Sequence, residues 1–560
     1  MNFYNLMLAN ELDLLPAPLG FTTWTSFWMV MIVSAVNAVL LSLAGYKFIQ
    51  VIQLSGYKTK GLFAWLKETK CSLWGRLAML SFLSCAALLM TNVLLSDFFK
   101  YKIMEYIGLV FYLIFTIVFI LNVFSVGQKT PLKYTKRVWR LLAVNFVLIF
   151  AATMAIVGFS EVNIPYFSYG IVGITPALIP FFVLLAHYIC YPFETLNNKH
   201  FVKKAKKKLK TCQGLIKIGI TGSYGKTSVK NILTTLLSEK YDVCASPFSY
   251  NTPLGLAKTI LNSLTDKNQV LIAEMGAKHV GDIKELCDMI NPSIGLITGI
   301  GNQHMSTFGT KERLISAKAE LASGLTDDGV LFVNLDSSGA SEIYEKATCK
   351  KVACRYKDNS SLIYVTDEKV TEKGSEFTLH MGSEKVKCKT TLLGEHNISN
   401  IVLAATVAIS LGLTLKEVAS GINNLVPTSH RLAIVPSNNS LIVIDDAYNG
   451  SVEGTKAALN VLSQFQGKKV IITPGLIELG GEQFNSNFEF GKNMAKVADF
   501  VIINGITNYD ALSSGLIFGG FDESHILRSG SLSQAVMLLS KITSPGDVVL
   551  FENDLPDNYA

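Results

Sequence analysis

Residues 215–232 most constrain what this chain can fold into, because an apolar strand there leads through a glycine turn into a helix. The turn reads Thr-Gly-Ser-Tyr-Gly-Lys-Thr over residues 221–227. Glycines in such a turn let backbone N–H groups point toward a phosphate. The fit to the strict pattern is incomplete, since its first glycine would fall at Ile220, whereas Gly219 lies one residue earlier. The alternative is an ordinary strand-to-helix turn with an exposed lysine.

The turn predicts a nucleotide phosphate site with a role for each side chain. Lys226 is expected to neutralise the outer phosphates, and the Thr227 hydroxyl is expected to hold Mg²⁺. The other residues predicted to bind the nucleotide here are Thr221, Gly222, Ser223, Gly225 and Ser228.

The first two hundred residues differ in composition from the rest of the 560-residue chain, of which 49% is hydrophobic. Residues 1–212 carry 20 Lys and Arg against 7 Asp and Glu, and the remainder carries 30 against 36. Because the basic excess belongs to the apolar part, anionic lipid headgroups are the expected partner and nucleic acid is not. Nine cysteines without paired short spacings indicate neither a zinc site nor a disulfide framework.

Five apolar runs are long enough to cross a bilayer, which needs about 20 residues each. They lie at 19–46, 77–98, 104–126, 140–160 and 167–191. The loops after the first and third runs are rich in Lys and Arg, so we expect them in the cytoplasm, with the N-terminus outside. The fifth run then delivers the chain to the cytoplasm, where the basic stretch 203–208 follows. That stretch is either a stop signal or a lipid-binding segment.

Few ionisable groups lie inside the runs, which disfavours a transport pathway. His187 is the main exception, and we expect it at the interface or hydrogen-bonded to a neighbouring helix. Residues 57–75 place apolar side chains among lysines, which fits an amphipathic helix on the inner leaflet or an ordinary loop.

From residue 213 to about 425, apolar strands alternate with helical patterns, which predicts an α/β unit with a mostly parallel sheet. Residues 350–391 read as short strands of a small antiparallel insertion. Ligands gather where parallel strands end. Glu274 and His304 follow two such strands and are candidate metal ligands near the phosphate loop. Taken singly, each is as well explained as a solvated strand-end or loop residue.

Beyond Pro427, strands at 441–445, 468–473, 499–503 and 547–551 alternate with helical patterns at 452–464, 486–498 and 531–543. This order predicts a second, Rossmann-like α/β domain. We therefore divide the chain into an α-helical membrane domain over 1–198, a basic linker over 199–212, a central domain over 213–426 and a C-terminal domain over 427–560.

Seven motifs in this order resemble the Mur ligase family, the ATP-dependent amide ligases of cell-wall peptide assembly, and in particular its D-alanyl-D-alanine-adding members. The motifs lie at 221–228, 274–283, 299–309, 317–320, 394–400, 430–432 and 444–449. The resemblance covers residues 213–560, and it implies a P-loop central domain, ATP and Mg²⁺ as cofactors, and an acyl phosphate intermediate.

The resemblance also implies roles for individual residues. Thr227, Glu274 and His304 would bind magnesium, and Lys318 would be carbamylated so that its new carboxylate helps to bind a second ion. Without the resemblance, Lys318 reads as a helix-surface lysine that pairs with Glu312 or Glu320.

For the nucleotide itself, the family implies Asn397 and Asn400 at the adenine end, Asp446 at the ribose and Arg431 at the terminal phosphate. Asn397 otherwise reads as an N-cap of the helix that follows.

The chain departs from the D-alanyl-D-alanine-adding pattern in two places. Asn449-Gly450-Ser451-Val452 stands where that pattern has Asn-Ala-Asn-Pro, and Glu552-Asn553-Asp554-Leu555 stands for a Lys-Gly-Ser-Arg-like turn. The usual domain for the uridine-nucleotide substrate is also replaced by the membrane runs.

We therefore expect a membrane-anchored, ADP-forming ligase that couples an amino acid or dipeptide, such as D-Ala-D-Ala, to a lipid-linked cell-wall precursor peptide. A ligase of a glutamyl-type capsule, or a non-catalytic nucleotide-binding scaffold or transporter, are the alternatives.

Overall fold

The computed structural model describes residues 24–57, 59–68, 131–163, 171–301, 305–371, 373–437, 440–448, 450–477 and 479–552, with scattered residues between 79 and 121. The chain forms two compact units, one within residues 1–197 and one within 198–555. Each unit is described by itself below.

The first unit is helical. Its elements are α2 (Trp24–Leu54), α3 (Thr59–Glu68), α6 (Lys136–Asn163), the 3₁₀ helix η3 (Ile171–Leu178) and the first part of α7 (Ile179–Thr211), whose residues from 198 on belong to the second unit. By length and composition, three stretches among the described residues could cross a membrane: Val30–Leu54, Lys136–Val157 and Thr175–Thr211. They correspond to the first, fourth and fifth predicted runs. The second and third runs, at 77–98 and 104–126, lie outside the described residues apart from scattered positions.

The α2 helix exposes apolar side chains and buries a polar one, which is the opposite of the pattern on a water-soluble protein. Large apolar side chains such as Trp28, Ile32 and Val36 are exposed, while the polar Asn37 is buried and donates a hydrogen bond to Thr153 Oγ1 of α6 at 2.9 Å. A solvent-exposed apolar stripe of this kind marks a surface that contacts lipid or another protein.

Three segments of this unit were the subject of sequence-based expectations. Residues 59–68 are helical, and Trp65 packs against Phe48 with ring centroids 6.1 Å apart. The segment predicted as a basic linker over 199–212 is mostly a continuation of α7, which ends at Thr211. His187 is buried on α7, with its ring 5.9 Å from that of Tyr188.

The central domain is built on a six-stranded parallel sheet with the order β2-β3-β1-β4-β5-β6. The strands are β2 (Val243–Ala245), β3 (Val270–Glu274), β1 (Ile216–Thr221), β4 (Ile294–Ile297), β5 (Val330–Asn334) and β6 (Lys350–Cys354). Strand β1 lies at the centre because its apolar residues are buried on both faces, as is typical of parallel sheets.

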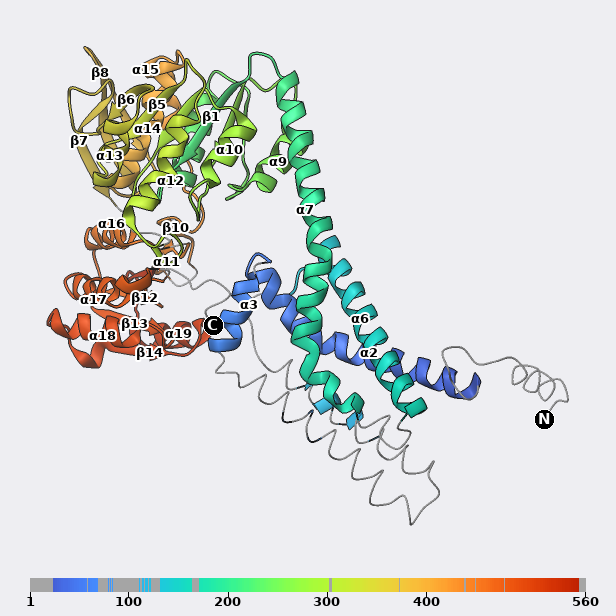
Figure 1. The fold of residues 1–560 in the computed structure, drawn as a ribbon. Helices are drawn as coiled ribbons and strands as arrows, with labels where there is room; N and C mark the ends of the chain where they lie inside the picture. Colours follow the sequence, from blue (N-terminus) through green and yellow to red (C-terminus); the bar gives the residue numbers. More distant parts are fainter. Residues whose placement is uncertain are drawn as a thin grey trace. The chain divides into compact units, whose positions relative to one another are not determined.

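Helices cover both faces of this sheet (Figure 1). One face packs on α8 (Lys226–Leu237), α14 (Glu395–Ser410) and α15 (Leu415–Asn423). The other packs on α9 (Pro253–Asn262), α10 (Asp282–Ile290), α12 (Lys311–Ser323) and α13 (Ser338–Lys346). The short helix α11 (Met305–Phe308) precedes α12.

The predicted antiparallel insertion is shorter than expected. The strands β7 (Tyr364–Thr371), β8 (Gly374–Met381) and β9 (Glu384–Thr390) form a separate antiparallel sheet. The expectation that the insertion begins at residue 350 is wrong, because β6 pairs in parallel with β5 and completes the main sheet. An edge strand of this length has the same alternating pattern in either arrangement, so the pattern does not distinguish them.

The C-terminal domain holds a second six-stranded sheet with the order β10-β11-β15-β12-β13-β14. The strands are β10 (Ala433–Val435), β11 (Ile442–Asp446), β15 (Val548–Glu552), β12 (Lys469–Thr473), β13 (Phe500–Asn504) and β14 (Ile526–Ser529). Only β10 is antiparallel to its neighbour.

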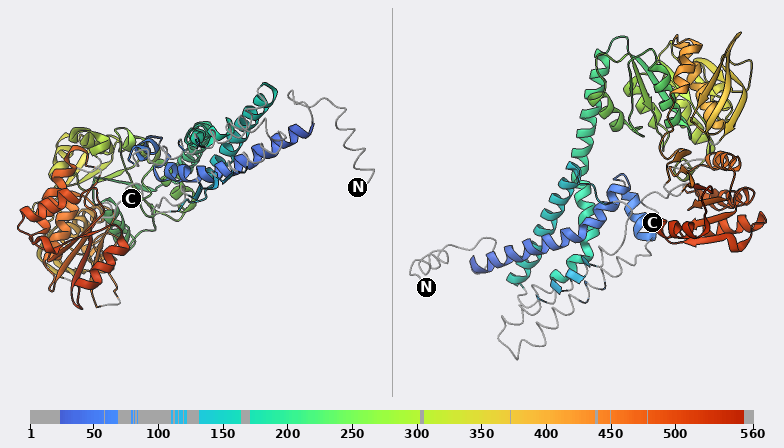
Figure 2. Two further views of the ribbon diagram at one scale, coloured as in Figure 1. Left: turned by 90° about the horizontal axis from the view of Figure 1, so that it is seen from below. Right: turned by 180° about the vertical axis from the view of Figure 1, so that it is seen from behind.

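Helices also flank both faces of this sheet, as the orange and red part of Figure 2 shows. One face packs on α16 (Val452–Ser463), α17 (Gln483–Met494) and α18 (Tyr509–Phe518), and the other on α19 (Leu532–Ile542). Two 3₁₀ helices, η4 (Gly480–Glu482) and η5 (Glu523–His525), complete the domain. All parallel strands of each sheet end at one edge, which is where ligand sites form in open α/β sheets.

Candidate nucleotide and phosphoryl-transfer site

The turn between β1 and α8 has the backbone geometry of a phosphate-binding loop. Gly225 adopts a left-handed conformation with φ of 79°, which favours glycine. A Cβ atom at Gly222 would lie only 2.1 Å from Thr298 Oγ1, so a larger residue does not fit there. The backbone N–H of Ser223 donates to the Gly299 carbonyl at 2.6 Å, which fixes the turn against the end of β4.

Lys226 is the first residue of α8 and closes back over this turn. Its Nζ donates hydrogen bonds to the carbonyls of Gly222 at 2.8 Å and Ser223 at 2.9 Å. Burial lowers the pKa of Lys226 to about 8, while the nearby Glu274 acts in the opposite direction. The lysine therefore holds its charge at the place where a phosphate would bind to the turn.

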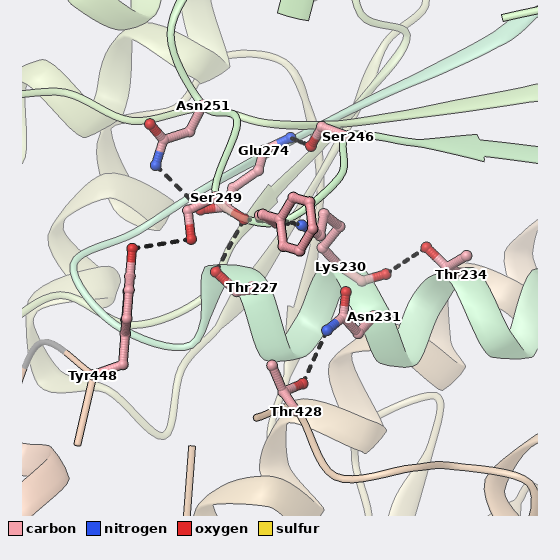
Figure 3. Close-up of polar contacts among 11 residues, drawn as sticks. Thr227, Lys230, Asn231, Thr234, Ser246, Ser249, Asn251, Glu274, Thr428 and Tyr448 are labelled. Carbon is pink, nitrogen blue, oxygen red and sulfur yellow. Dashed lines mark hydrogen bonds and ion pairs between the residues drawn. The ribbon is translucent and has the colours of Figure 1, made fainter. Parts of the chain in front are cut away.

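Glu274, at the end of β3, is the centre of a polar cluster drawn in Figure 3. Its side chain is 1% exposed and accepts hydrogen bonds from Thr227 Oγ1 at 3.0 Å and from Asn251 Nδ2 at 3.2 Å. Lys230 Nζ lies 3.4 Å from the same carboxylate oxygen that Thr227 contacts. Ser246 Oγ accepts a hydrogen bond from the Glu274 backbone N–H. The carboxylate is thus held in one orientation by three donors.

Two of the predicted metal ligands are oxygen atoms, the hard ligand type that Mg²⁺ prefers. Thr227 Oγ1 and Glu274 Oε2 lie 3.0 Å apart. Neighbouring oxygens around an octahedral Mg²⁺ ion are about 3 Å apart, given metal–oxygen distances of about 2.1 Å. The hydroxyl and the carboxylate therefore fit the ion in type and spacing. His304, the third predicted ligand, lies outside the described residues.

Lys318 lies on α12. The alternative to the carbamate role was a lysine on the surface of this helix. The side chain is instead 3% exposed, and its pKa is lowered to about 7, chiefly by burial and then by the charge of Lys226. Glu320 accepts hydrogen bonds from the backbone N–H groups of Gly281 and Lys284. The alternative of a helix-surface ion pair for Lys318 is therefore wrong.

Two asparagines of α14 lie near the phosphate loop. Asn397 is the third residue of the helix and donates to the Leu393 carbonyl at 2.8 Å, so the N-cap interpretation is wrong and Gly394 occupies that position. Asn400 Nδ2 contacts Asn397 Oδ1 at 3.5 Å. Asn400 Oδ1 lies 3.1 Å from the place of a Cβ on Gly225, so this side chain lies against the turn.

The remaining loop residues have structural partners. The hydroxyl of Thr221 donates to the Met275 carbonyl at 3.0 Å, and that of Ser223 donates to the Gly301 carbonyl at 3.1 Å. Ser228 lies in the first turn of α8 and is partly exposed. The loop is therefore fixed to the ends of β3 and β4.

Arg431 and Asp446 belong to the start of the C-terminal domain. Arg431 donates to the Tyr448 carbonyl at 2.9 Å and stacks on the Tyr448 ring, 4.6 Å from its centroid. Asp446 accepts a hydrogen bond from the Leu432 N–H at 3.1 Å, and burial raises its pKa to about 6 despite the opposing charge of Arg431.

Two hydrogen bonds join the C-terminal part to the phosphate-loop region (Figure 3). The Tyr448 hydroxyl donates to Ser249 Oγ at 3.2 Å, and Asn231 Nδ2 of α8 donates to Thr428 Oγ1 at 2.9 Å. Burial lowers the pKa of Arg431. Glu274 lies close enough for its negative charge to act on this pKa in the opposite direction. The two α/β domains thus contribute to one polar region.

Sequence reasoning missed Lys230 and Asn251, which contact Glu274, and the burial of Glu552. Lys230 follows Lys226 by one helical turn, which is a signal that could have placed it beside the same site. The burial of Glu552, whose side chain is 0% exposed, depends on strand pairing across the domain and has no local signal.

Two family models match the part of the chain described in this section. Residues 220–408 match the Mur ligase middle domain, and residues 430–552 match the Mur ligase glutamate ligase domain. The UDP-N-acetylmuramoyl-tripeptide–D-alanyl-D-alanine ligase of Bacillus subtilis is 29% identical over 343 residues, which cover 60% of this chain and 72% of that protein. The ligase of the same name from Mycobacterium tuberculosis is 28% identical over 358 residues, covering 60% and 70%.

Solved structures show the same fold for the second unit. The MurF ligase of Thermotoga maritima in complex with ADP superimposes with a TM-score of 0.57 at 24% identity, over 64% of this chain and 80% of that one. MurF from Acinetobacter baumannii gives a TM-score of 0.59 at 23% identity, over 65% and 78%. Together with the order of motifs around the phosphate loop, these matches show that the chain belongs to the Mur ligase family and is an ATP-dependent ligase.

Proposed function

We propose that this protein is a membrane-anchored peptide ligase that activates a carboxylate of a cell-wall precursor peptide with ATP and couples it to an amine. The observation that carries this proposal is the cluster in which Lys226 closes the phosphate loop and Thr227 contacts Glu274 at 3.0 Å. A phosphate-binding turn, a fixed carboxylate and a hydroxyl at metal-ligand spacing are what phosphoryl transfer from a nucleotide requires.

In the first step, a carboxylate oxygen of the precursor attacks the γ-phosphorus of ATP, the bond to the β-phosphate oxygen breaks, and ADP leaves. Lys226, at the phosphate loop, would place positive charge on the transferring phosphoryl group, and Arg431 would do so from the C-terminal domain. Releasing Lys226 from the carbonyls of Gly222 and Ser223 makes its N–H groups available to the phosphate oxygens.

Mg²⁺, when bound, would neutralise charge on the phosphate oxygens. Thr227, Glu274 and His304 would hold it, and Lys318 would contribute through a carbamate. A lysine with a pKa of about 7 is partly neutral at physiological pH, and only the neutral amine adds CO₂. Asn397 and Asn400 would contact the adenine end of the nucleotide, and Asp446 the ribose.

In the second step, the amine nitrogen attacks the acyl carbon and loses a proton, the bond to the phosphate oxygen breaks, and inorganic phosphate leaves. The similar ligases named above add D-alanyl-D-alanine, so we propose this dipeptide or a related amine as donor. The departures at residues 449–452 and 552–555 set this chain apart from those ligases, and a ligase of a glutamyl-type capsule is the second candidate.

The helical unit would anchor the enzyme, with its catalytic domains in the cytoplasm and its N-terminus outside. The support is the exposed apolar stripe of α2 and the basic loops at 47–76 and 127–140. Labelling of single cysteines from outside intact cells tests this topology. A cysteine near Asp13 should react and one near Lys133 should not, and the reverse pattern would overturn the topology.

We further propose that the precursor is linked to a lipid, because a substrate confined to the bilayer raises the effective concentration of the two partners. The basic residues around Lys58–Arg76 and 203–208 would favour pyrophosphate-bearing headgroups. The alternative is that the spans only anchor the enzyme or dock other proteins. A protein lacking residues 1–198 should retain ATP hydrolysis but lose most ligation of a lipid-linked peptide. Equal ligation of a soluble nucleotide peptide by this fragment would refute the lipid-linked substrate.

A further inference from the structure

The last turns of α7 belong to the catalytic core, although the same helix begins in the first unit. Helix α7 extends from Ile179 to Thr211, and its residues from 198 on are part of the second unit. Ala205 and Leu209 of these turns are buried in the core of the central domain. This end of α7 is therefore a packed element of the ligase and not a flexible linker.

The partner of these turns is α9, the helix that follows β2. Ala205 and Leu209 belong to the same core cluster as Leu256, Ala257 and Ile260 of α9. Figure 1 shows α9 beside α7. Because protein interiors are close-packed, a displacement of one of these helices is transmitted to the other.

Lys208 ties the two helices together at the C-terminal end of α9. Its Nζ donates hydrogen bonds to the carbonyl of Leu264 at 2.6 Å and to that of Leu261 at 3.4 Å. The last carbonyls of a helix have no partner within the helix, and they form the negative end of its dipole, so a cation is favourable there. The neighbouring Lys207 is exposed, so Lys208 differs from it in acting on the core.

The opposite end of α9 adjoins the carboxylate of the phosphoryl-transfer site. Asn251 immediately precedes Thr252, the N-cap residue of α9. The Asn251 side chain donates to Glu274 Oε1 at 3.2 Å, and its backbone carbonyl accepts a hydrogen bond from the Gly276 N–H at 2.9 Å. Thr227 contacts the other oxygen, Oε2. Asn251 therefore helps to orient the carboxylate oxygen that Thr227 does not contact.

These contacts connect α7 to Glu274 through a single short helix. Lys208 holds the C-terminal end of α9, and Asn251 holds the carboxylate from the other end. Helix α9 has ten residues, Pro253–Asn262, and its backbone hydrogen bonds make it move as one body. A shift of α9 along its axis would change the geometry between Asn251 and Glu274.

We propose that Lys208 is a positioning residue for Glu274, acting through α9 and Asn251, so that helix α7 helps to set the affinity of the ligase for Mg²⁺. The inference rests on the proposed function, in which Glu274 is a ligand of that ion. It gives the helical unit a role beyond anchoring, because a change in α7 would reach the site at which the phosphoryl group is transferred.

The competing explanation is that Lys208 only stabilises the fold by capping α9. Its loss would then lower the midpoint of thermal unfolding and leave the Mg²⁺ affinity of the folded protein unchanged. A double-mutant cycle between Lys208 and Asn251 separates the two explanations, since residues that act through one another do not have additive effects.

The experiment uses the full-length protein in detergent and titration calorimetry. It compares the affinity for the Mg²⁺ complex of a non-hydrolysable ATP analogue with the affinity for the Mg²⁺-free analogue. Lys208→Met, Asn251→Ala and the double variant are the test proteins. Lys208→Arg keeps the cation, and Lys207→Met removes an exposed neighbouring lysine, so these two variants are the matched controls.

We expect Lys208→Met to weaken binding of the Mg²⁺ complex by about 2- to 30-fold, as for mutations that alter the coupling between distant sites, with binding of the Mg²⁺-free analogue unchanged. The double variant should bind the complex no more weakly than Asn251→Ala does, and both controls should bind like wild type. Unchanged affinity of Lys208→Met for the complex, or losses that multiply in the double variant, would overturn the inference.

Hydrogen exchange of the wild-type protein covers the case in which Lys208→Met misfolds. Coupling between two sites is reciprocal, so the Mg²⁺ complex should slow the exchange of backbone amides in residues 203–212 more than the Mg²⁺-free analogue does. Equal exchange of these amides with both ligands contradicts the inference. Failure of the proposed function is read separately, as ATP consumption without an amide product, because neither of these measurements requires a product.

Discussion

Glu274 and Glu552 are both buried acids at the last position of central parallel strands, yet their surroundings are opposite. Glu274 accepts hydrogen bonds from Thr227 and Asn251 and lies 3.4 Å from Lys230, whereas Glu552 has no partner among the described residues. The comparison shows that one α/β domain prepares its carboxylate as a charged, oriented group before the ligand binds. In the other domain, no donor among the described residues orients the Glu552 carboxyl.

The largest effect is expected at the phosphate loop of the central domain, which also contains Glu274. Lys226→Ala removes the cation that closes over Gly222 and Ser223, and should lower ATP turnover by about 100- to 1000-fold, as for loss of one preorganised charge in a transition state. Steady-state ADP release measures it. Lys258→Ala, at an exposed lysine of α9, is the control and should behave like wild type. Comparable turnover in both variants would remove Lys226 from the reaction.

Lys318 is a buried lysine that we propose carries a carbamate. Its carbamate would be a second carboxylate near the phosphate loop, alongside Glu274. Lys318→Ala should lose most activity and regain part of it with short-chain carboxylic acids, which replace the carbamate. Because its pKa is about 7, wild-type activity should fall below that pH as the amine becomes protonated, and should also fall when CO₂ is removed. Full activity of Lys318→Ala without added acid excludes the carbamate.

Lys230 tests whether the pairing of Glu274 stabilises the fold. Its Nζ also donates to the Phe248 carbonyl, and the side chain is 2% exposed. Lys230→Met leaves Glu274 buried with less compensation, and should lower the free energy of unfolding by about 3–5 kcal/mol. Chemical denaturation measures this loss. Adding Glu274→Gln to Lys230→Met should recover part of it, and an unchanged loss in the double variant would show that the ion pair is not its cause.

The smallest expected effect is a pH dependence of stability that comes from Asp446 and Glu552 of the C-terminal domain. Burial raises the pKa of Asp446 from 3.8 to about 6, so between these values the folded protein keeps a proton that the unfolded chain has lost. Stability should therefore be highest at the acidic end of that window and fall as pH rises through it. Glu552→Gln removes a second buried carboxyl, whose pKa is also raised by burial, and should therefore reduce the fall. A steeper fall in this variant would contradict the account of the pair.

The sequence predicted four strands of each sheet because each is a continuous apolar run: β1, β3, β4 and β5 of the first, and β11, β12, β13 and β15 of the second. Short elements such as β2 and β14, with three and four residues, give too little pattern to be recognised. The helix α9 was missed although Thr252 caps it and Pro253 opens it, which is a local signal.

The candidate site was predictable where the residues form one local motif or end adjacent strands. Thr227 and Glu274 lie in contact because β1 and β3 are neighbours in the sheet. The burial of Lys318 was not predictable, because it depends on helix α12 packing against the sheet through a face that contains a lysine. The isolation of Glu552 likewise depends on β15 inserting between β11 and β12.

The central claim is that this chain forms an amide bond at the expense of ATP. The direct test incubates the purified full-length protein in detergent with ATP, a lipid-linked precursor peptide and D-alanyl-D-alanine, and analyses the products by mass spectrometry. The account predicts ADP, inorganic phosphate and a lipid-linked peptide that is heavier by the dipeptide less one water. ATP hydrolysis without any amide product from either the lipid-linked or the soluble peptide would contradict the claim and favour a nucleotide-binding scaffold.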